Sequence, residues 1–269
     1  MLQNLHTHST FCDGIHTPEQ MVQFALQKGF TSLGFSGHSY LYYSTYANLS
    51  PEKTRRYREE INRLKSVYAD RLKIYLGLEV DTFSTEELDY YDYLIGSTHY
   101  LETTDGYKGF DGNAAHAKNY VDTYFGGDGL AYAKAYYATL ATLPQRGKFD
   151  IIGHFDLITK HMDTETLFDP ESPRYRQYAL EAMEALRPHI GLFEVNTGAM
   201  ARGLRKTPYP LKDLVKELRH MGFGAVISAD CHDGTKLDLG YEDARQLLYD
   251  CGFRERYLLT DTGFEATAL

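Results

Sequence analysis

Short apolar runs alternate along this chain with longer amphipathic segments, a pattern that predicts strands followed by crossover helices. The expected strands cover residues 2–6, 32–37, 73–79, 93–97, 150–153, 191–195 and 224–228, with an eighth candidate at 257–259. The expected helices cover residues 18–28, 51–69, 130–143, 174–186, 211–221 and 242–249. The first two begin where Thr17 and Ser50 each precede a proline, because a hydroxyl can cap the free amides and proline fits the first turn. Seven or eight strands in this alternation predict an α/β barrel.

One stretch departs from the alternation. Residues 101–129 contain several glycines and are only weakly periodic. An elaborated βα connection, a kind of loop that is often functional, and a surface excursion with some local helix both fit this pattern. No internal repeat or low-complexity segment divides residues 1–269, and α/β barrels of roughly 200 to 250 residues or more fold around one core. We therefore expect one domain.

Composition excludes several classes of protein. The formal charge of −9 disfavours a nucleic-acid partner, because binding to a phosphate backbone needs clustered Lys and Arg. No apolar run reaches the roughly 18 to 20 residues of a membrane span, and the N-terminus lacks the features of a signal peptide, so a cytoplasmic location is expected. The three cysteines, Cys12, Cys231 and Cys251, are odd in number without C-x-x-C spacing, which predicts reduced thiols. The oligomeric state stays open.

The chemistry-bearing residues fall where the predicted strands end. His6 and His8 end the first run, and Asp230 and His232 follow the run at 224–228 with the same spacing. Residues two apart on an extended segment point to one side, so the first pair can grip one ion with two nitrogens. The second pair supplies an oxygen and a nitrogen, which suit Zn²⁺, Mn²⁺ or Fe. Four further residues close or follow other strands: His38, Glu79, His99 and His154. Since the ends of barrel strands converge on one face, we expect a metal site there.

A lone buried histidine is more often a hydrogen-bonded core residue than a ligand. Six of the 11 histidines, however, lie at strand ends, and such a collective pattern is improbable by chance. The remaining five are interpreted as structural or surface residues: His16, His116, His161, His189 and His220.

Segments spanning residues 6–234 resemble the successive motifs of the PHP (polymerase and histidinol phosphatase) superfamily: HTHSTFCDG, GFSGHS, GLEVD, GSTHY, GHFD, EVNTG and SADCHDG. The segments GSTHYL and EVNTGAMARGLRKTPYP are similar to those of the monofunctional histidinol phosphate phosphatases. The resemblance implies a distorted (β/α)7 TIM-like barrel with a site for two or three divalent metal ions at the C-terminal ends of its strands. It also implies hydrolysis of L-histidinol phosphate to L-histidinol and phosphate, a step of histidine biosynthesis.

The resemblance also implies which residues of this sequence are metal ligands. It implies that one ion is held by His6, His8 and Asp230, and that Glu79 bridges to a second ion held by His99 and His154. It implies a third ion held by Asp13, His38 and His232. Some family members carry histidine where Asp13 stands, so occupancy of the third position stays open.

Elementary chemistry agrees with this assignment. Two cations roughly 3.5 to 4 Å apart can share a water, lower its pKa and clamp the oxygens of an in-line phosphoryl displacement. We expect a metal-bridging hydroxide to attack the phosphorus, with Glu79, Asp230 and His232 serving catalysis directly. Candidate phosphate contacts downstream of the strands are Lys160, Arg202, Arg205 and Lys206, with neutral hydrogen bonds from Asn196 and Thr197. The four cations could equally be solvated loop charges, and Arg202 and Lys160 are the preferred pair.

The sequence gives fewer signals for the part of the site that would bind the alcohol portion of the substrate. Phe155, Asp156 and Glu194 follow or belong to predicted strands and could attract a cationic amino alcohol. Three alternatives share the metal ligands: a phosphoesterase for another small phosphate ester or nucleotide, a DNA-processing domain, and a metal-binding module without catalysis. The acidic charge and the complete ligand set disfavour the last two.

Overall fold

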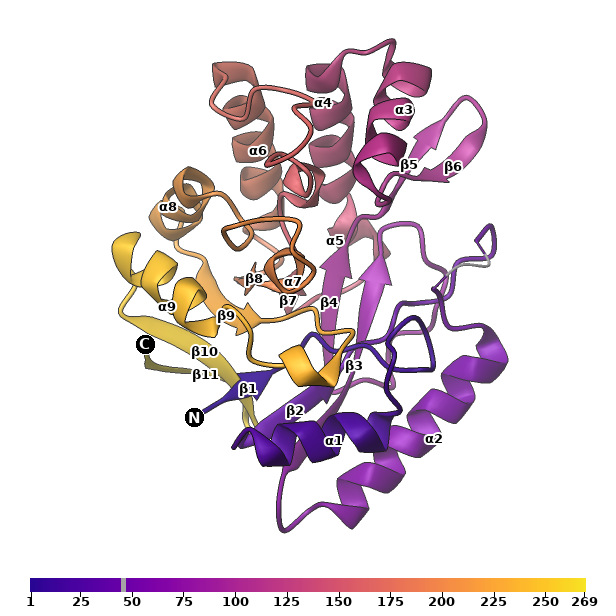
Figure 1. Ribbon diagram of the computed structural model, residues 1–269, viewed down its shortest axis with the longest axis vertical. Helices are drawn as coiled ribbons and strands as arrows, with labels where there is room; N and C mark the ends of the chain where they lie inside the picture. The colour runs from indigo at the N-terminus through magenta and orange to yellow at the C-terminus, as the bar shows by residue number, and fades with distance from the viewer. Residues whose placement is uncertain (45–46) are drawn as a thin grey trace.

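The computed structural model, which describes residues 1–44 and 47–269, contains a sheet of seven parallel strands (Figure 1). Their order is β1 (Gln3–Asn4), β2 (Ser32–Phe35), β3 (Lys73–Asp81), β4 (Tyr93–Ser97), β7 (Ile151–Ile152), β8 (Leu192–Asn196) and β9 (Gly224–Ser228). A parallel bridge between Thr7 and Cys231 joins the two outer strands just beyond their ends. There the Cys231 amide donates to the His6 carbonyl and the His8 amide donates to the Cys231 carbonyl, both at 2.9 Å. The predicted distorted seven-stranded barrel is confirmed.

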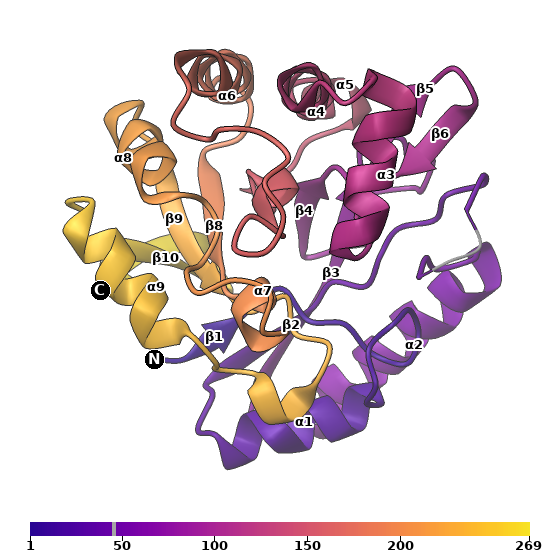
Figure 2. The same cartoon turned by 45° about the horizontal axis from the view of Figure 1, so that its top comes forward.

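Helices ring the outside of this barrel (Figure 2). The long ones are α1 (Pro18–Gln27), α2 (Pro51–Val67), α3 (Ala114–Phe125), α4 (Gly129–Leu140), α6 (Pro173–Leu186), α8 (Lys212–His220) and α9 (Tyr241–Asp250). Short turns of helix are α5 (Leu143–Arg146), η1 (Leu157–Thr159), α7 (Gly198–Ala201) and η2 (Gly234–Lys236).

The helix boundaries follow local signals. Thr17 forms a capping box, in which its hydroxyl accepts from the Gln20 amide and the Gln20 side chain accepts from the Thr17 amide. Ser50 caps α2 through the Lys53 amide. One predicted boundary is wrong: α4 ends at Leu140, and Pro144 lies in the first turn of the separate helix α5, where its missing amide costs no hydrogen bond.

The weakly periodic stretch folds into regular elements. Strands β5 (Tyr100–Thr103) and β6 (Gly106–Gly109) form an antiparallel hairpin, and helix α3 (Ala114–Phe125) follows it. The connection packs back onto the loop after β7, because Lys160 pairs with Asp111 at 2.6 Å and His161 hydrogen-bonds the Gly112 carbonyl at 2.8 Å. It is therefore an elaborated βα connection whose end lies beside the mouth of the barrel.

The other end of the barrel is closed by apolar packing. The eighth predicted strand is β10 (Glu255–Thr260), which pairs with β11 (Gly263–Ala268) in a hairpin outside the seven-stranded sheet. Its Leu259 contributes to the same buried cluster as inward-facing barrel residues: Leu5, Tyr75, Tyr93, Ile95, Ile151, Leu192 and Val226. The Gln3 side chain fixes the hairpin, donating to the Leu259 carbonyl at 2.9 Å and accepting from its amide at 2.8 Å. This apolar layer leaves the opposite end for polar chemistry.

Two further sequence expectations have structural counterparts. The cysteines Cys12, Cys231 and Cys251 are free. Burial raises the pKa of the Cys231 thiol to about 12, so this thiol stays protonated at neutral pH. Within residues 1–44 and 47–269, no helix combines the length and apolar character needed to cross a membrane.

Candidate metal centre

The nine predicted ligands converge at the C-terminal ends of the barrel strands. Glu79 lies in β3, and the others follow strands: His6, His8 and Asp13 after β1, His38 after β2, His99 after β4, His154 after β7, and Asp230 and His232 after β9. Their imidazole rings pack against one another, with His8 stacked on His232 at a centroid distance of 4.1 Å. Segments up to about 225 residues apart in the sequence thus supply one cluster.

Glu79 occupies the middle of the cluster and is 1% exposed. Its Oε1 lies 2.9 Å from His154 Nε2 and 3.4 Å from His99 Nε2. Its Oε2 lies 2.9 Å from His38 Nδ1, 3.2 Å from His6 Nε2 and 3.6 Å from His8 Nε2. The two oxygens of one carboxylate therefore face two different sets of imidazoles, the geometry that a bridging ligand requires.

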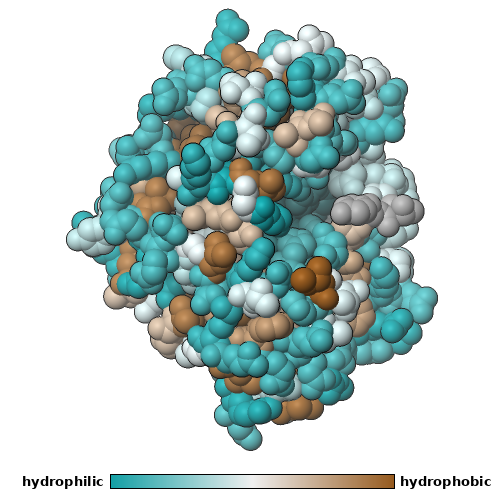
Figure 3. Space-filling model, in the orientation of Figure 1, coloured by the Kyte–Doolittle hydropathy of each residue, from teal (hydrophilic) through white to brown (hydrophobic). Residues whose placement is uncertain are grey.

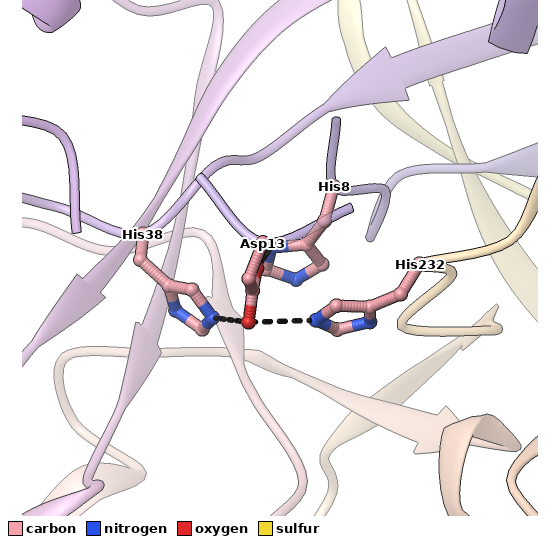
Figure 4. A group of neighbouring side chains, drawn as sticks. All are labelled: His8, Asp13, His38 and His232. Carbon is pink, nitrogen blue, oxygen red and sulfur yellow. Dashed lines mark ion pairs between the residues drawn. The ribbon is translucent and has the colours of Figure 1, made fainter. Parts of the chain in front are cut away.

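A second group gathers around Asp13 (Figure 4). Asp13 Oδ2 lies 3.3 Å from His232 Nε2 and 3.5 Å from His38 Nε2, while Asp13 Oδ1 lies 3.5 Å from His8 Nδ1. His8 and His38 each present their other nitrogen to Glu79. The two groups therefore share imidazoles, and the division into three separate ligand sets is less sharp than the sequence suggests.

Tight backbone turns orient the carboxylates of Asp230 and Asp13. Asp230 has a φ of 43°, a left-handed conformation that is rare for residues with a side chain and concentrates at functional sites. Gly198 lies against it, and a Cβ there would approach Asp230 Cβ to 2.8 Å. Gly14 has the same role beside Asp13, since a Cβ would meet the Ser9 amide nitrogen at 2.6 Å. Both turns need glycine to bring the backbone this close.

Several buried side-chain atoms of the ligand residues form no hydrogen bond within the part of the chain that the structure describes. They are His6 Nε2, His8 Nε2, Asp13 Oδ1, Glu79 Oε2 and His154 Nδ1. A buried polar atom that lacks a hydrogen bond costs about 1–3 kcal/mol, and His6 Nε2, His8 Nε2 and Glu79 Oε2 instead face one another at 3.2 and 3.6 Å. Imidazole nitrogens and carboxylate oxygens are ligands of divalent transition metals, and bound cations would satisfy most of these atoms. The residues therefore fit a divalent metal site.

The electrostatics of the cluster lead to the same conclusion. Burial opposes protonation of His6, but Glu194, Glu79 and Asp230 outweigh it and raise the pKa of His6 well above its usual value. His99 behaves alike beside Glu79 and Asp81, with its pKa raised to about 10. In contrast, burial and the neighbouring His232 and His38 lower the pKa of His8 to about 3. The imidazoles and carboxylates of the cluster therefore hold protons between them, and a divalent cation can replace those protons.

Two of the predicted phosphate contacts lie at the edge of the cluster. Arg202 donates to Asp230 Oδ2 at 3.1 Å and lies 3.3 Å from His232 Nδ1, and its side chain is 31% exposed. Lys160 is paired with Asp111. Burial opposes ionisation of Asp111, but Lys160 and His99 outweigh it and lower the pKa of Asp111 to about 2. Arg202 therefore contacts two ligands directly, whereas Lys160 is paired with Asp111, which lines the site.

Three of the other four predicted contacts are engaged within the protein, and the fourth is exposed. Arg205 is buried, donates to Thr159 Oγ1 and stacks over the Tyr209 ring. Asn196 donates to Glu194 at 2.7 Å and accepts from the Gly198 amide at 2.8 Å, and Thr197 donates to the Leu239 carbonyl at 2.6 Å. Lys206 is exposed, and its backbone amide donates to Asp163. Among the described residues, no hydrogen bond or ion pair joins these four side chains to the nine ligands.

Three acidic residues near the cluster lacked a correct role in the sequence interpretation. Asp81, two residues after Glu79 on the same strand, accepts from the His99 amide at 2.8 Å, and the two-residue period could have revealed it. Asp111 lines the site from the 101–129 connection, which gave no sequence signal. Glu194 was expected to attract substrate together with Phe155 and Asp156, but all three are fully buried, so that expectation is wrong.

A cavity of about 100 Å³ opens beside the cluster. It is lined by ligands and by neighbouring residues, among them Asn48 and Asp111 from loops and Tyr100 from β5. The face drawn in Figure 3 is largely hydrophilic and hollowed near its middle. A small polar molecule could therefore reach Glu79, His38 and His99 from solvent.

Known proteins share this architecture. A protein of Deinococcus radiodurans named a probable histidinol-phosphatase is 29% identical over 262 residues, covering 93% of either chain. A structure from Listeria monocytogenes matches with a TM-score of 0.76 and 21% identity, covering 90% of this chain and 99% of the other. The Lactococcus lactis histidinol phosphate phosphatase, solved with zinc, L-histidinol and phosphate, matches with a TM-score of 0.70 and 20% identity over 98% of both chains.

The structural matches, at this level of identity, show a common fold. The sequence supplies the family: the model of the PHP domain matches residues 4–198, well over half of the chain. That range contains the motifs of β1 to β8, including Glu79 and its imidazole neighbours His6, His8, His38 and His99. This chain belongs to the PHP domain family.

Proposed function

We propose that this protein is a metal-dependent phosphomonoesterase that hydrolyses L-histidinol phosphate to L-histidinol and phosphate. The observation that carries the proposal is the convergence of five imidazoles on the buried carboxylate of Glu79, within a cluster of nine candidate ligands. Membership of the PHP domain family supports the chemistry. The names of a full-length relative and of a structure with bound L-histidinol and phosphate support the substrate.

The geometry suggests how two or three ions would be held. Glu79 would bridge, with its Oε1 toward His99 and His154 and its Oε2 toward His6, His8 and His38. Asp230 would complete the set around His6 and His8, since its Oδ1 lies 3.1 Å from His8 Nε2. Asp13, His38 and His232 would hold the third ion. Zinc, manganese and iron all suit such donors.

Bound ions would supply an activated water and positive charge for the phosphoryl oxygens. The protein adds a cation of its own, because Arg202 lies beside Asp230 with its guanidinium partly open to solvent and can grip a phosphate with two donors. Lys160, held in place by Asp111, contributes a second positive charge at the rim. Phosphoryl transfer depends mainly on positioning and charge neutralisation, and these side chains provide both.

The cavity lining suits the alcohol end of the proposed substrate. Histidinol carries an ammonium group and an imidazole, and the cavity presents the carboxylate of Asp111 and the ring of Tyr100. A carboxylate attracts the ammonium group, and an aromatic ring can stack on the imidazole. The lining therefore favours a small cationic amino alcohol over an anionic leaving group.

A comparison of substrates tests this proposal. Phosphate release would be measured with L-histidinol phosphate, a nucleoside monophosphate and a simple aryl phosphate at equal metal loading. A site built for histidinol should favour the first by on the order of 10³ or more in kcat/KM. Equal efficiency on all three would leave a general phosphatase, and a clear preference for the nucleotide would transfer the assignment to another phosphoesterase of the same family.

A further inference from the structure

Glu194 is a fully buried carboxylate in β8, the one barrel strand that supplies none of the nine predicted ligands. Its neighbours in the strand, Phe193 and Val195, are core residues. A charge in such surroundings is costly unless several donors satisfy it. The donors that surround Glu194 indicate what it does.

One oxygen of Glu194 holds a ligand side chain. Its Oε2 lies 2.9 Å from His6 Nδ1 and also accepts from the Ser228 hydroxyl. The opposite nitrogen of the same ring, Nε2, lies 3.2 Å from Glu79 and 3.7 Å from Asp230 Oδ1. An ionised carboxylate can only accept, so the proton of a neutral His6 resides on Nδ1 and the lone pair of Nε2 faces the metal centre.

The other oxygen holds a ligand backbone. Glu194 Oε1 accepts from the His154 amide at 2.6 Å and from Asn196 Nδ2 at 2.7 Å. His154 follows β7, and its ring lies near Oε1 of Glu79, whereas the ring of His6 lies near Oε2. One side chain thus connects the ends of β1, β7 and β9, and it contacts a candidate ligand on each side of the bridging carboxylate.

We infer that Glu194 is a positioning residue for the metal centre, which selects the metal-binding tautomer of His6 and fixes the backbone of His154 without being a ligand itself. This inference rests on the proposed metal site. It also explains Asn196, a predicted substrate contact whose amide group is occupied in holding Glu194 and the Gly198 turn. Partners of this kind typically change metal affinity by about 10- to 100-fold when they are lost.

The substitution Glu194→Gln tests the mechanism without changing shape. A glutamine that keeps its oxygen toward His154 and Asn196 turns its NH2 group toward His6 Nδ1. That nitrogen must then accept, which moves the proton to Nε2 and removes the lone pair that faces the ions. In the reverse orientation, the NH2 group of the glutamine faces the His154 amide and Asn196 Nδ2, which are both donors, so those two hydrogen bonds are lost. Either way, zinc binding should weaken by about 10- to 100-fold.

Zinc affinity would be measured by competition with a chromophoric chelator, without substrate, and thermal unfolding of the metal-free proteins would be followed in parallel. Asp156→Asn is the matched control, because Asp156 is equally buried but its carboxylate accepts from the Leu211 amide, outside the cluster. We expect both variants to lose some stability and only Glu194→Gln to lose zinc affinity. Should Glu194→Gln fail to fold, Glu194→Asp keeps the charge but withdraws the oxygens, and several-fold weaker binding is expected.

Unchanged zinc affinity in a folded Glu194→Gln or Glu194→Asp variant would overturn the inference, as would an equal loss in Asp156→Asn. A wild-type protein that binds no zinc, manganese or iron would overturn the metal site itself and the inference with it. The zinc-affinity measurement contains no substrate. If the wild-type protein binds metal but does not hydrolyse histidinol phosphate, the proposed function alone is refuted. The two ideas therefore fail separately.

Discussion

At the scale of single residues, the site depends on side chains that contact several partners at once. Glu79 meets five imidazoles through two oxygens. The sequence revealed this residue and its neighbours because histidines and carboxylates recur at strand ends. It did not reveal that Arg205 and Thr197 find their partners inside the protein, since those hydrogen bonds join segments that only the fold brings together. Asn196 differs, because its partner Glu194 lies two residues away on the same strand, where the two-residue period places both side chains on one face.

Replacing Glu79 with glutamine should lower kcat by about 100-fold or more while the fold survives, because a neutral amide holds two cations poorly. Activity, metal content and circular dichroism would be measured together. Asp150→Asn is a suitable control, since Asp150 caps the Leu94 amide at the opposite end of the barrel strands. Near-normal turnover and metal content in Glu79→Gln would remove this carboxylate from the centre of the site.

Arg202→Ala and Lys160→Ala should each lower kcat/KM by about tenfold or more without removing metal, because these cations are assigned to the phosphate. Lys216, which pairs with Asp213 on the exposed face of α8, provides a surface control. If neither variant alters kcat/KM, the assigned phosphate contacts are wrong. If Arg202→Ala loses metal, its contact with Asp230 matters more for the ions than for the substrate.

At the scale of elements, local signals predicted most of the structure. Strands β4 and β9 have the predicted bounds, and α1 and α2 begin at the predicted prolines. The placement of two further segments did not follow from local signals. The eighth apolar run pairs in a separate hairpin that Gln3 holds against the barrel, and the 101–129 stretch folds because it packs beside the loop after β7. Neither long-range contact has a local sequence signal.

The capping box of α1 gives a prediction at this scale. Thr17→Ala should lower the free energy of unfolding by about 1 kcal/mol, because the Gln20 amide loses its acceptor. Thr17→Ser keeps a hydroxyl and should stay close to wild type. Denaturant unfolding of both variants checks this, and equal stabilities of Thr17→Ala and wild type would show that the cap contributes nothing.

At the scale of the whole molecule, the barrel separates an apolar end, sealed by the β10–β11 hairpin, from a polar end with unpaired ligand atoms. That division makes stability and metal binding interdependent. Ions that bind only the native state stabilise it by about 4 kcal/mol at 1,000 times their Kd. For a chain of this size the midpoint of thermal unfolding should rise by roughly 5 to 10 °C with saturating zinc and fall again with a chelator. A midpoint of thermal unfolding that changes with neither zinc nor chelator would contradict a metal site coupled to the fold.

The central claim is that metal ions at this cluster carry out hydrolysis of L-histidinol phosphate. The direct measurement removes metal from the purified protein, restores zinc or manganese in known ratios, and follows phosphate release from L-histidinol phosphate alongside metal content. The proposed function predicts negligible turnover in the metal-free protein and a rate that rises until two or three ions are bound per chain. Full turnover without metal, or full metal loading without phosphate release, would contradict it.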